Sequence, residues 1–74
     1  MSNENLLKLH IMAAEAQIHK AQYHGGILEI EEFKKRMEPL QSHNDIQVDN
    51  PDHAERVDHC RQIIDGALTL ANLS

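Results

Sequence analysis

Residues 3–26 read NENLLKLHIMAAEAQIHKAQYHGG, and this stretch decides the fold. It predicts a helix over about 3–24, because Asn3 can cap the first turn and Gly25-Gly26 stops the last one. Its apolar residues recur three and four positions apart, which is the period of a helix and not of a strand. We therefore expect one long α-helix here.

Apolar residues line two opposite sides of this expected helix. One side is a seam with the 4,3,4,3 spacing of a coiled coil, formed by Leu7, Ile11, Ala14, Ile18 and Ala21. A second set lies on nearly the opposite face and consists of Leu9, Met12, Ala16 and Tyr23. A helix with two apolar sides is expected to be covered on both. We expect the seam to face the chain's last helix. The second set would need another subunit or the middle segment as its cover, and we expect it to mediate self-association.

Two more helices are expected after the glycine pair. Ile30, Phe33 and Met37 form one narrow apolar stripe in a helix over about 28–38, which Pro39 ends. Whether the run 27–30 is helical or extended stays open. Residues 39–50 form a polar connector, and a third helix over about 51–72 follows. Its cap is Asn50 with Pro51 at the first helical position, and its apolar seam is Val57, Cys60, Ile64, Ala67 and Ala71. Gly66 interrupts this helix, and a close approach by another backbone would account for it.

These segments predict an all-α chain with a single domain over 1–74. We expect a helical hairpin of two long antiparallel helices with a shorter middle helix, completed by association with other copies. A 74-residue chain buries only about 60% of the surface that its unfolded form exposes, so one small core is marginal. Cys60 is the only cysteine and cannot form a disulfide within the chain. Oligomerisation or unusually tight helix packing is then the expected support, with a bound metal as a third option.

Charge and composition limit the classes of function. The net charge is −5, from twelve acidic and seven basic residues, whereas binding a phosphate backbone needs a basic face. We therefore expect no direct nucleic-acid binding. The sequence has no secretory signal and no run of about 18 apolar residues, so we expect no membrane span and a cytoplasmic protein.

The leading hypothesis is a small acidic regulatory or inhibitory protein-interaction module that self-associates. No catalytic set of residues is recognisable, so we expect no enzyme and no cofactor. The predicted partner-binding surface is an acidic strip on one side of the last helix, formed by Glu55, Asp58, Gln62, Asp65 and Thr69. An ordinary solvated face would carry the same pattern.

Two alternatives come from other classes of function. An oligomeric binder of a nucleotide-like ligand would use Tyr23, His24 and Lys20, although a helix carboxyl end disfavours phosphate. A metal-binding helical protein would use two i,i+4 pairs, Glu15 with His19 and Glu55 with His59. Both pairs point away from the apolar seams, and solvent-exposed ion pairs explain them better.

Overall fold

The computed structural model describes residues 4–74, and every regular element in this range is helical. The prediction of an all-α chain is confirmed, with no β-strand among these residues. No described helix combines the length and the apolar character needed to cross a bilayer. The α-helices are α1 (Glu4–His24), α2 (Ile30–Met37) and α3 (Ala54–Leu70), and the 3-10 helices are η1 (Glu38–Asp45) and η2 (Pro51–His53).

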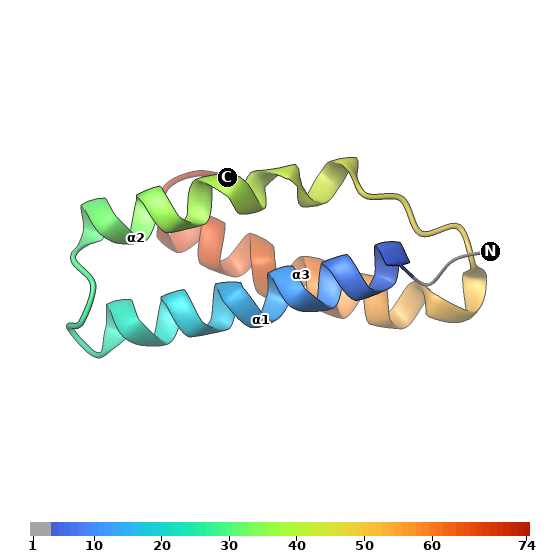
Figure 1. Ribbon diagram of the computed structural model, residues 1–74, viewed down its shortest axis with the longest axis horizontal. Coiled ribbons are helices and arrows are strands. Elements are labelled where there is room, and N and C mark those ends of the chain that lie inside the picture. The colour runs from blue at the N-terminus through green and yellow to red at the C-terminus, as the bar shows by residue number, and fades with distance from the viewer. Residues whose placement is uncertain (1–3) are drawn as a thin grey trace.

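The chain makes three passes along a bundle that measures 40 × 18 × 16 Å (Figure 1). α2 and η1 together form the return pass, so α1 and α3 run in the same direction. Contacts between the starts of α1 and α3 agree with this, because His10 Nδ1 lies 3.6 Å from Cys60 Sγ. The predicted antiparallel hairpin of two long helices is therefore wrong. The prediction has one short middle helix, whereas α2 and η1 contribute eight residues each to a full return pass. Because this pass runs back along the bundle, α3 starts again beside the start of α1.

α1 ends in a Schellman motif, which redirects the chain toward α2. The Gly26 N–H donates to the Tyr23 carbonyl at 3.2 Å and the Ile27 N–H donates to the Gln22 carbonyl at 2.9 Å. Gly26 holds the left-handed position at φ 78°, one residue later than Gly25, which the sequence favours. A left-handed residue lets the last carbonyls of a helix find donors. Residues 27–29 are irregular, neither helical nor strand, and α2 begins at Ile30.

The expected polar connector is helical over its first half. Pro39 occupies the start of η1, where its missing N–H costs nothing, so it begins a new helix instead of leading into a loop. Leu40 and His43 continue the buried side of Phe33 and Met37 along this pass. Residues 46–50 have no regular secondary structure. The Asn5 side chain anchors them by donating to the Gln47 carbonyl at 2.7 Å.

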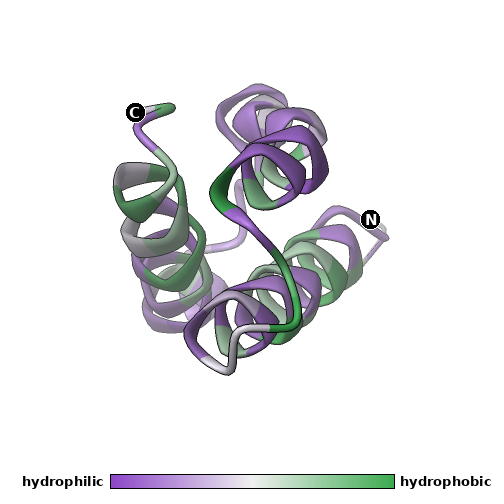
Figure 2. Ribbon diagram, turned by 90° about the vertical axis from the view of Figure 1, so that its left-hand side faces the viewer, coloured by the Kyte–Doolittle hydropathy of each residue, from purple (hydrophilic) through white to green (hydrophobic). Residues whose placement is uncertain are grey.

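The core lies between the three passes, which surround a common interior when viewed nearly end-on (Figure 2). Its buried cluster is Leu9, Ala13, Ala16, Phe33, Met37, Leu40, Cys60, Ile64, Ala67, Leu68 and Ala71. Tyr23 stacks on Phe33 with ring centroids 4.7 Å apart. Small residues on α1 and α3 let these two helices approach closely, and the bulky residues of the return pass fill the third side.

The two faces of α1 are the reverse of the prediction. Leu9 and Ala16, predicted to mediate self-association, are fully buried, and Met12 and Tyr23 of the same set pack against the core. The seam predicted to face α3 points outward instead. The expected seam of α3 is correctly placed, because Cys60, Ile64, Ala67 and Ala71 are buried and Val57 packs beside them.

Local capping contacts lie at the start of η2 and at the end of α3. The Asn50 side chain accepts from the Asp52 N–H at 2.9 Å and caps η2, which leads directly into α3. Asn72, at φ 61°, takes the left-handed position at the other end, and the Leu73 N–H donates to the Leu68 carbonyl at 2.8 Å. A Cβ at Gly66 would meet nothing within 4 Å, so the expected close approach of another backbone is not found among residues 4–74.

Candidate interaction surface on α1

The outward side of α1 carries a continuous apolar stripe. We call it the outer stripe, and it consists of Leu7, Ile11, Ala14, Ile18 and Ala21, all of them exposed. Leu7, Ile11 and Ile18 keep 59%, 51% and 55% of their surface accessible. Ile27, just beyond the helix, is 74% exposed. Half-exposed aliphatic residues in helical register leave one whole side of α1 without a covering partner within the described chain.

Helical geometry explains why this stripe stays outside. The fully buried Leu9 and Ala16 are seven residues apart, which places them one above the other at the centre of the inner face. The outer stripe is about half a turn away from them around the helix axis. Neither α2 nor α3 can reach both faces, so the chain buries one face and leaves the other in water.

Polar side chains border the outer stripe on both sides. Lys8, Glu15 and Gln22 recur at intervals of seven along one border, and His10, Gln17 and His24 along the other. This arrangement of an apolar seam with polar flanks is that of a helix that packs against another helix. The outer stripe is therefore a candidate surface for packing against another helix.

A shallow hollow of about 430 Å³ adjoins the amino end of the outer stripe. Leu7 contributes to its wall from α1, together with Leu6 and His10, and His53 and Arg56 contribute from η2 and α3. Behind it, His10 Nδ1 lies 3.6 Å from the buried Cys60 Sγ. Burial raises the pKa of the Cys60 thiol. The thiol therefore stays protonated at neutral pH and is a poor nucleophile.

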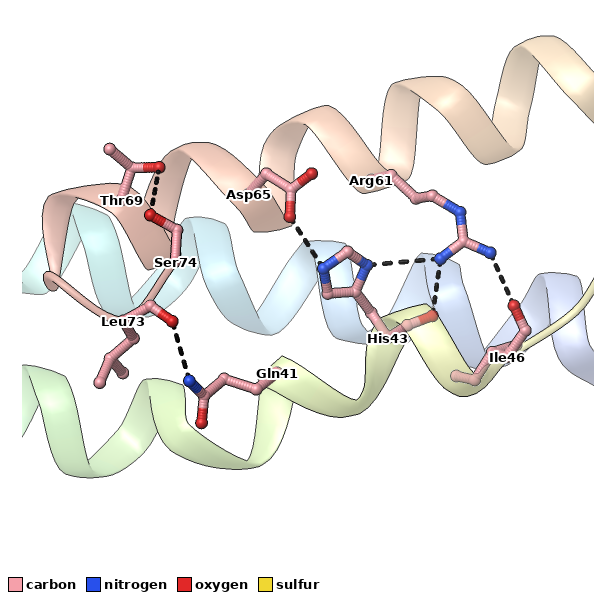
Figure 3. A network of polar contacts seen from close by, with 8 residues as sticks. All are labelled: Gln41, His43, Ile46, Arg61, Asp65, Thr69, Leu73 and Ser74. Carbon is pink, nitrogen blue, oxygen red and sulfur yellow. Dashed lines mark hydrogen bonds and ion pairs between the residues drawn. The ribbon is translucent and has the colours of Figure 1, made fainter.

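The most developed polar network joins η1 to α3 (Figure 3). The Arg61 guanidinium donates to the carbonyls of His43 and Ile46, at 2.6 Å each, at the end of η1. It also lies 3.4 Å from His43 Nδ1, while His43 Nε2 lies 2.8 Å from an Asp65 carboxylate oxygen. His43 is fully buried. His43 Nδ1 can accept from the Arg61 guanidinium, whereas Nε2 lies close to the Asp65 carboxylate without the alignment of a hydrogen bond.

This network explains a buried histidine that the sequence did not single out. The Arg61 guanidinium donates to carbonyls at the carboxyl end of η1. A cation is favoured there because the helix dipole places partial negative charge at that end. Its guanidinium is engaged by protein atoms, which suits a structural clamp better than catalysis. The available signal was the spacing of Met37, Leu40 and His43, three residues apart, which is the period of a 3-10 helix.

The acidic strip predicted on the last helix lies on the exposed side of α3. All five members, Glu55, Asp58, Gln62, Asp65 and Thr69, are exposed. Asp65 turns partly toward the interior through its ion pair with His43 but remains 58% accessible. The strip and the outer stripe belong to different helices, and each points away from the shared core.

The residues predicted to bind a nucleotide-like ligand are drawn into packing or remain apart. One face of the Tyr23 ring is covered by Phe33. The ring of His24 lies 5.9 Å from Tyr23 at a tilt of 41°, and Lys20 is exposed. The exposed Gly25 and Gly26 are accounted for by the helix cap, so they form no anion-binding loop.

The four weak metal candidates are not brought together. Among residues 4–74, no group of three or more His, Cys, Asp or Glu side chains is close enough to hold a metal ion. Glu15, Glu55 and His59 are exposed, and His19 is partly buried. One pair lies on α1 and the other on α3.

Comparison with known proteins adds no relative: no protein-family model, curated protein or solved structure matches this chain.

Proposed function

We propose that this chain is a non-enzymatic protein-interaction module of the regulatory or inhibitory kind. The observation that carries the proposal is the outer stripe, where Leu7, Ile11 and Ile18 are each more than half exposed. Single apolar residues on a surface are ordinary, but a contiguous stripe of them marks a binding surface. Spacing of three and four residues fits an α-helix as the bound element.

The acidic strip of α3 is proposed as a second surface, for a partner with a basic face. Glu55, Asp58 and Asp65 are all exposed there, and the chain carries a net charge of −5. Charges of one sign accelerate the encounter with a partner of the opposite sign and select against acidic proteins. A module of this kind alters its partner by covering the partner's surface, which is the sense in which we call it regulatory or inhibitory.

Position-specific photo-crosslinking in the source cells tests both surfaces. A photoreactive amino acid replaces Gln17, beside the outer stripe, or Gln62, within the acidic strip. Lys35, exposed on α2 and outside both surfaces, is the matched control. We expect adducts from the first two positions and none from the third, and adducts with a basic protein from Gln62 in particular.

Equal adducts from all three positions, or none from Gln17 and Gln62, would contradict the proposal. A thermal-shift assay separates it from the two alternatives, because any ligand that binds the native state raises the melting temperature. We expect nucleotides and chelators to leave the melting temperature unchanged. A large shift by either would favour the ligand or the metal alternative instead.

A further inference from the structure

We propose that the outer stripe is occupied by the same stripe of a second copy, with the two α1 helices antiparallel about a two-fold axis. This rests on the proposed function only in treating the outer stripe as a binding surface. In a symmetric antiparallel pair, the residue number rises along one helix as it falls along the other. The numbers of two residues that face one another therefore always add up to the same value, which defines the register. The register with a sum of 25 places Leu7, Ile11, Ala14 and Ile18 each opposite another apolar residue of the stripe.

Side-chain size is complementary at the centre of this register, where Ile11 faces the small Ala14 of the second copy. Leu7 faces Ile18 on either side of this centre, and each contact occurs twice by symmetry. Pairing large with small residues lets two helices interdigitate without a cavity. In a parallel pair, Ile11 would meet Ile11 and Ala14 would meet Ala14, so wide and narrow layers would alternate along the seam.

Charge along the border supports the antiparallel direction independently. Lys8 and Glu15 lie on the same border of the outer stripe, and both are exposed. In an antiparallel pair this border runs beside its own symmetry copy, so Lys8 of each chain lies next to Glu15 of the other. In a parallel pair the two residues are separated by a full heptad, about 10 Å along the axis. A parallel pair would also bring the two Glu4 side chains together in the seam.

The amino-terminal end of α1 fits the same register. Glu4 faces Ala21 of the second copy, so its carboxylate lies at the edge of the seam instead of opposite another acid. The dipoles of two antiparallel helices also oppose one another, which favours this direction over the parallel one. Size, charge and dipole thus select a second copy of α1 and its orientation.

Solution mass as a function of concentration is the first test. The chain has a mass of 8.4 kDa, and we expect light scattering to show a rise toward twice that value as concentration increases. Ile18→Glu places a charge in the seam and should keep the chain at the monomer mass throughout. Lys35→Gln makes the same change in net charge on α2, outside both surfaces, and should behave as the unmodified chain. A monomer mass for the unmodified chain at all concentrations, or an Ile18→Glu dimer, would overturn the proposal.

Folding of the variants is checked separately. Ile18 is 55% exposed in the single chain, so Ile18→Glu should keep its far-ultraviolet circular dichroism spectrum. Its melting temperature at high dilution should match that of the unmodified chain.

A charge swap tests the register. Lys8→Glu sets two acids beside one another at both symmetric positions and should weaken dimerisation about five-fold at low salt. Adding Glu15→Lys to the same chain restores opposite charges and should return the dissociation constant to within about two-fold of the unmodified value. A double variant as weak as Lys8→Glu alone would overturn the antiparallel register.

Disulfide trapping tests the direction. Ala21→Cys places the new thiols 17 residues apart along an antiparallel pair, about 25 Å, so oxidation should not link the chains. Glu4→Cys mixed with Ala21→Cys should give a linked heterodimer. Rapid linking of Ala21→Cys to itself would show a parallel pair and overturn the orientation. Loss of the dimer while Gln62 still yields partner adducts would refute this inference and leave the proposed function standing.

Discussion

Leu7 and Leu9 are the same residue type, two positions apart on α1, yet one is 59% exposed and the other is fully buried. Both belong to apolar stripes with helical spacing. The difference arises from what lies opposite, because Phe33, Met37 and the small residues of α3 fill the space beside Leu9 and nothing in the described chain covers Leu7. Equal hydrophobic periodicity thus serves folding on one side of a helix and remains open for association on the other.

The largest expected effect separates these two leucines. Leu9→Ala removes buried methyl groups and leaves a cavity, so it should lower the free energy of unfolding by about 2–5 kcal/mol. Leu7→Ala should lower it by less than about 1 kcal/mol when measured at high dilution, where association does not contribute. Chemical denaturation of both variants checks this. Equal losses at the two positions would mean that the inner and outer faces are not distinct.

His43 and Asp65 give the polar version of the same contrast. His43→Ala empties a buried site and leaves the Arg61 guanidinium and a carboxylate without their ring partner, so we expect a loss of about 1–3 kcal/mol. Asp65→Asn changes an exposed member of the same ion pair and should cost less than about 1 kcal/mol. The two denaturation midpoints measure this. A larger loss for Asp65→Asn would indicate that the charge, and not the burial, holds η1 to α3.

Two glycines should respond to alanine with smaller changes in stability, and the two changes should have opposite signs. A Cβ at Gly66 meets nothing within 4 Å, and the residue lies in the exposed side of α3. Gly66→Ala should therefore stabilise the chain by roughly 0.5–1 kcal/mol. Gly26→Ala should destabilise it by about 1 kcal/mol, because φ is 78° there. Thermal melting of the pair provides the measurement, and a destabilising Gly66→Ala would point to an unrecognised contact on that side of α3.

The smallest effect concerns Cys60 and appears only at alkaline pH. Burial raises the pKa of its thiol from the ordinary value of 9.0. Stability from this group is complete below the unfolded value and is lost as pH rises toward the folded value, since the unfolded chain ionises first. Between pH 8 and 9.5 we expect a loss of less than about 1 kcal/mol. Cys60→Ser should lack this component of the pH slope, whereas an identical slope would mean that the thiol is not protected.

The number and approximate bounds of the helices follow from local signals. Asn50 and Pro51 mark the start of the third helical segment, and Gly25-Gly26 mark the end of the first. The inner side of α3 follows from its single well-defined seam. These features depend on residues close in sequence, which is why they can be read without the tertiary structure.

The packing and direction of the helices could not be predicted from local sequence signals. α1 has two apolar faces, and only the shape of the opposing residues decides which one is buried. The direction of α3 depends on the length of the return pass. The sequence predicts that this pass ends at Pro39, whereas Pro39 lies at the start of η1 and the pass continues. His43 was placed in a polar connector, yet the last turn of η1 carries it into the core. The acidic strip is exposed as expected, but its role depends on a partner and remains a prediction.

The three-pass topology has a practical consequence for re-engineering the chain. An antiparallel hairpin would have brought the two ends of the described chain together, whereas the third pass carries α3 away from the start of α1, and the chain ends beside the return pass, where the Gln41 side chain donates to the Leu73 carbonyl (Figure 1). A circular permutant would therefore need a long linker running back beside the helices. Conversely, a fluorescent protein or affinity tag attached after Ser74 would sit well away from the amino-terminal half of α1 and would leave Leu7 free of obstruction.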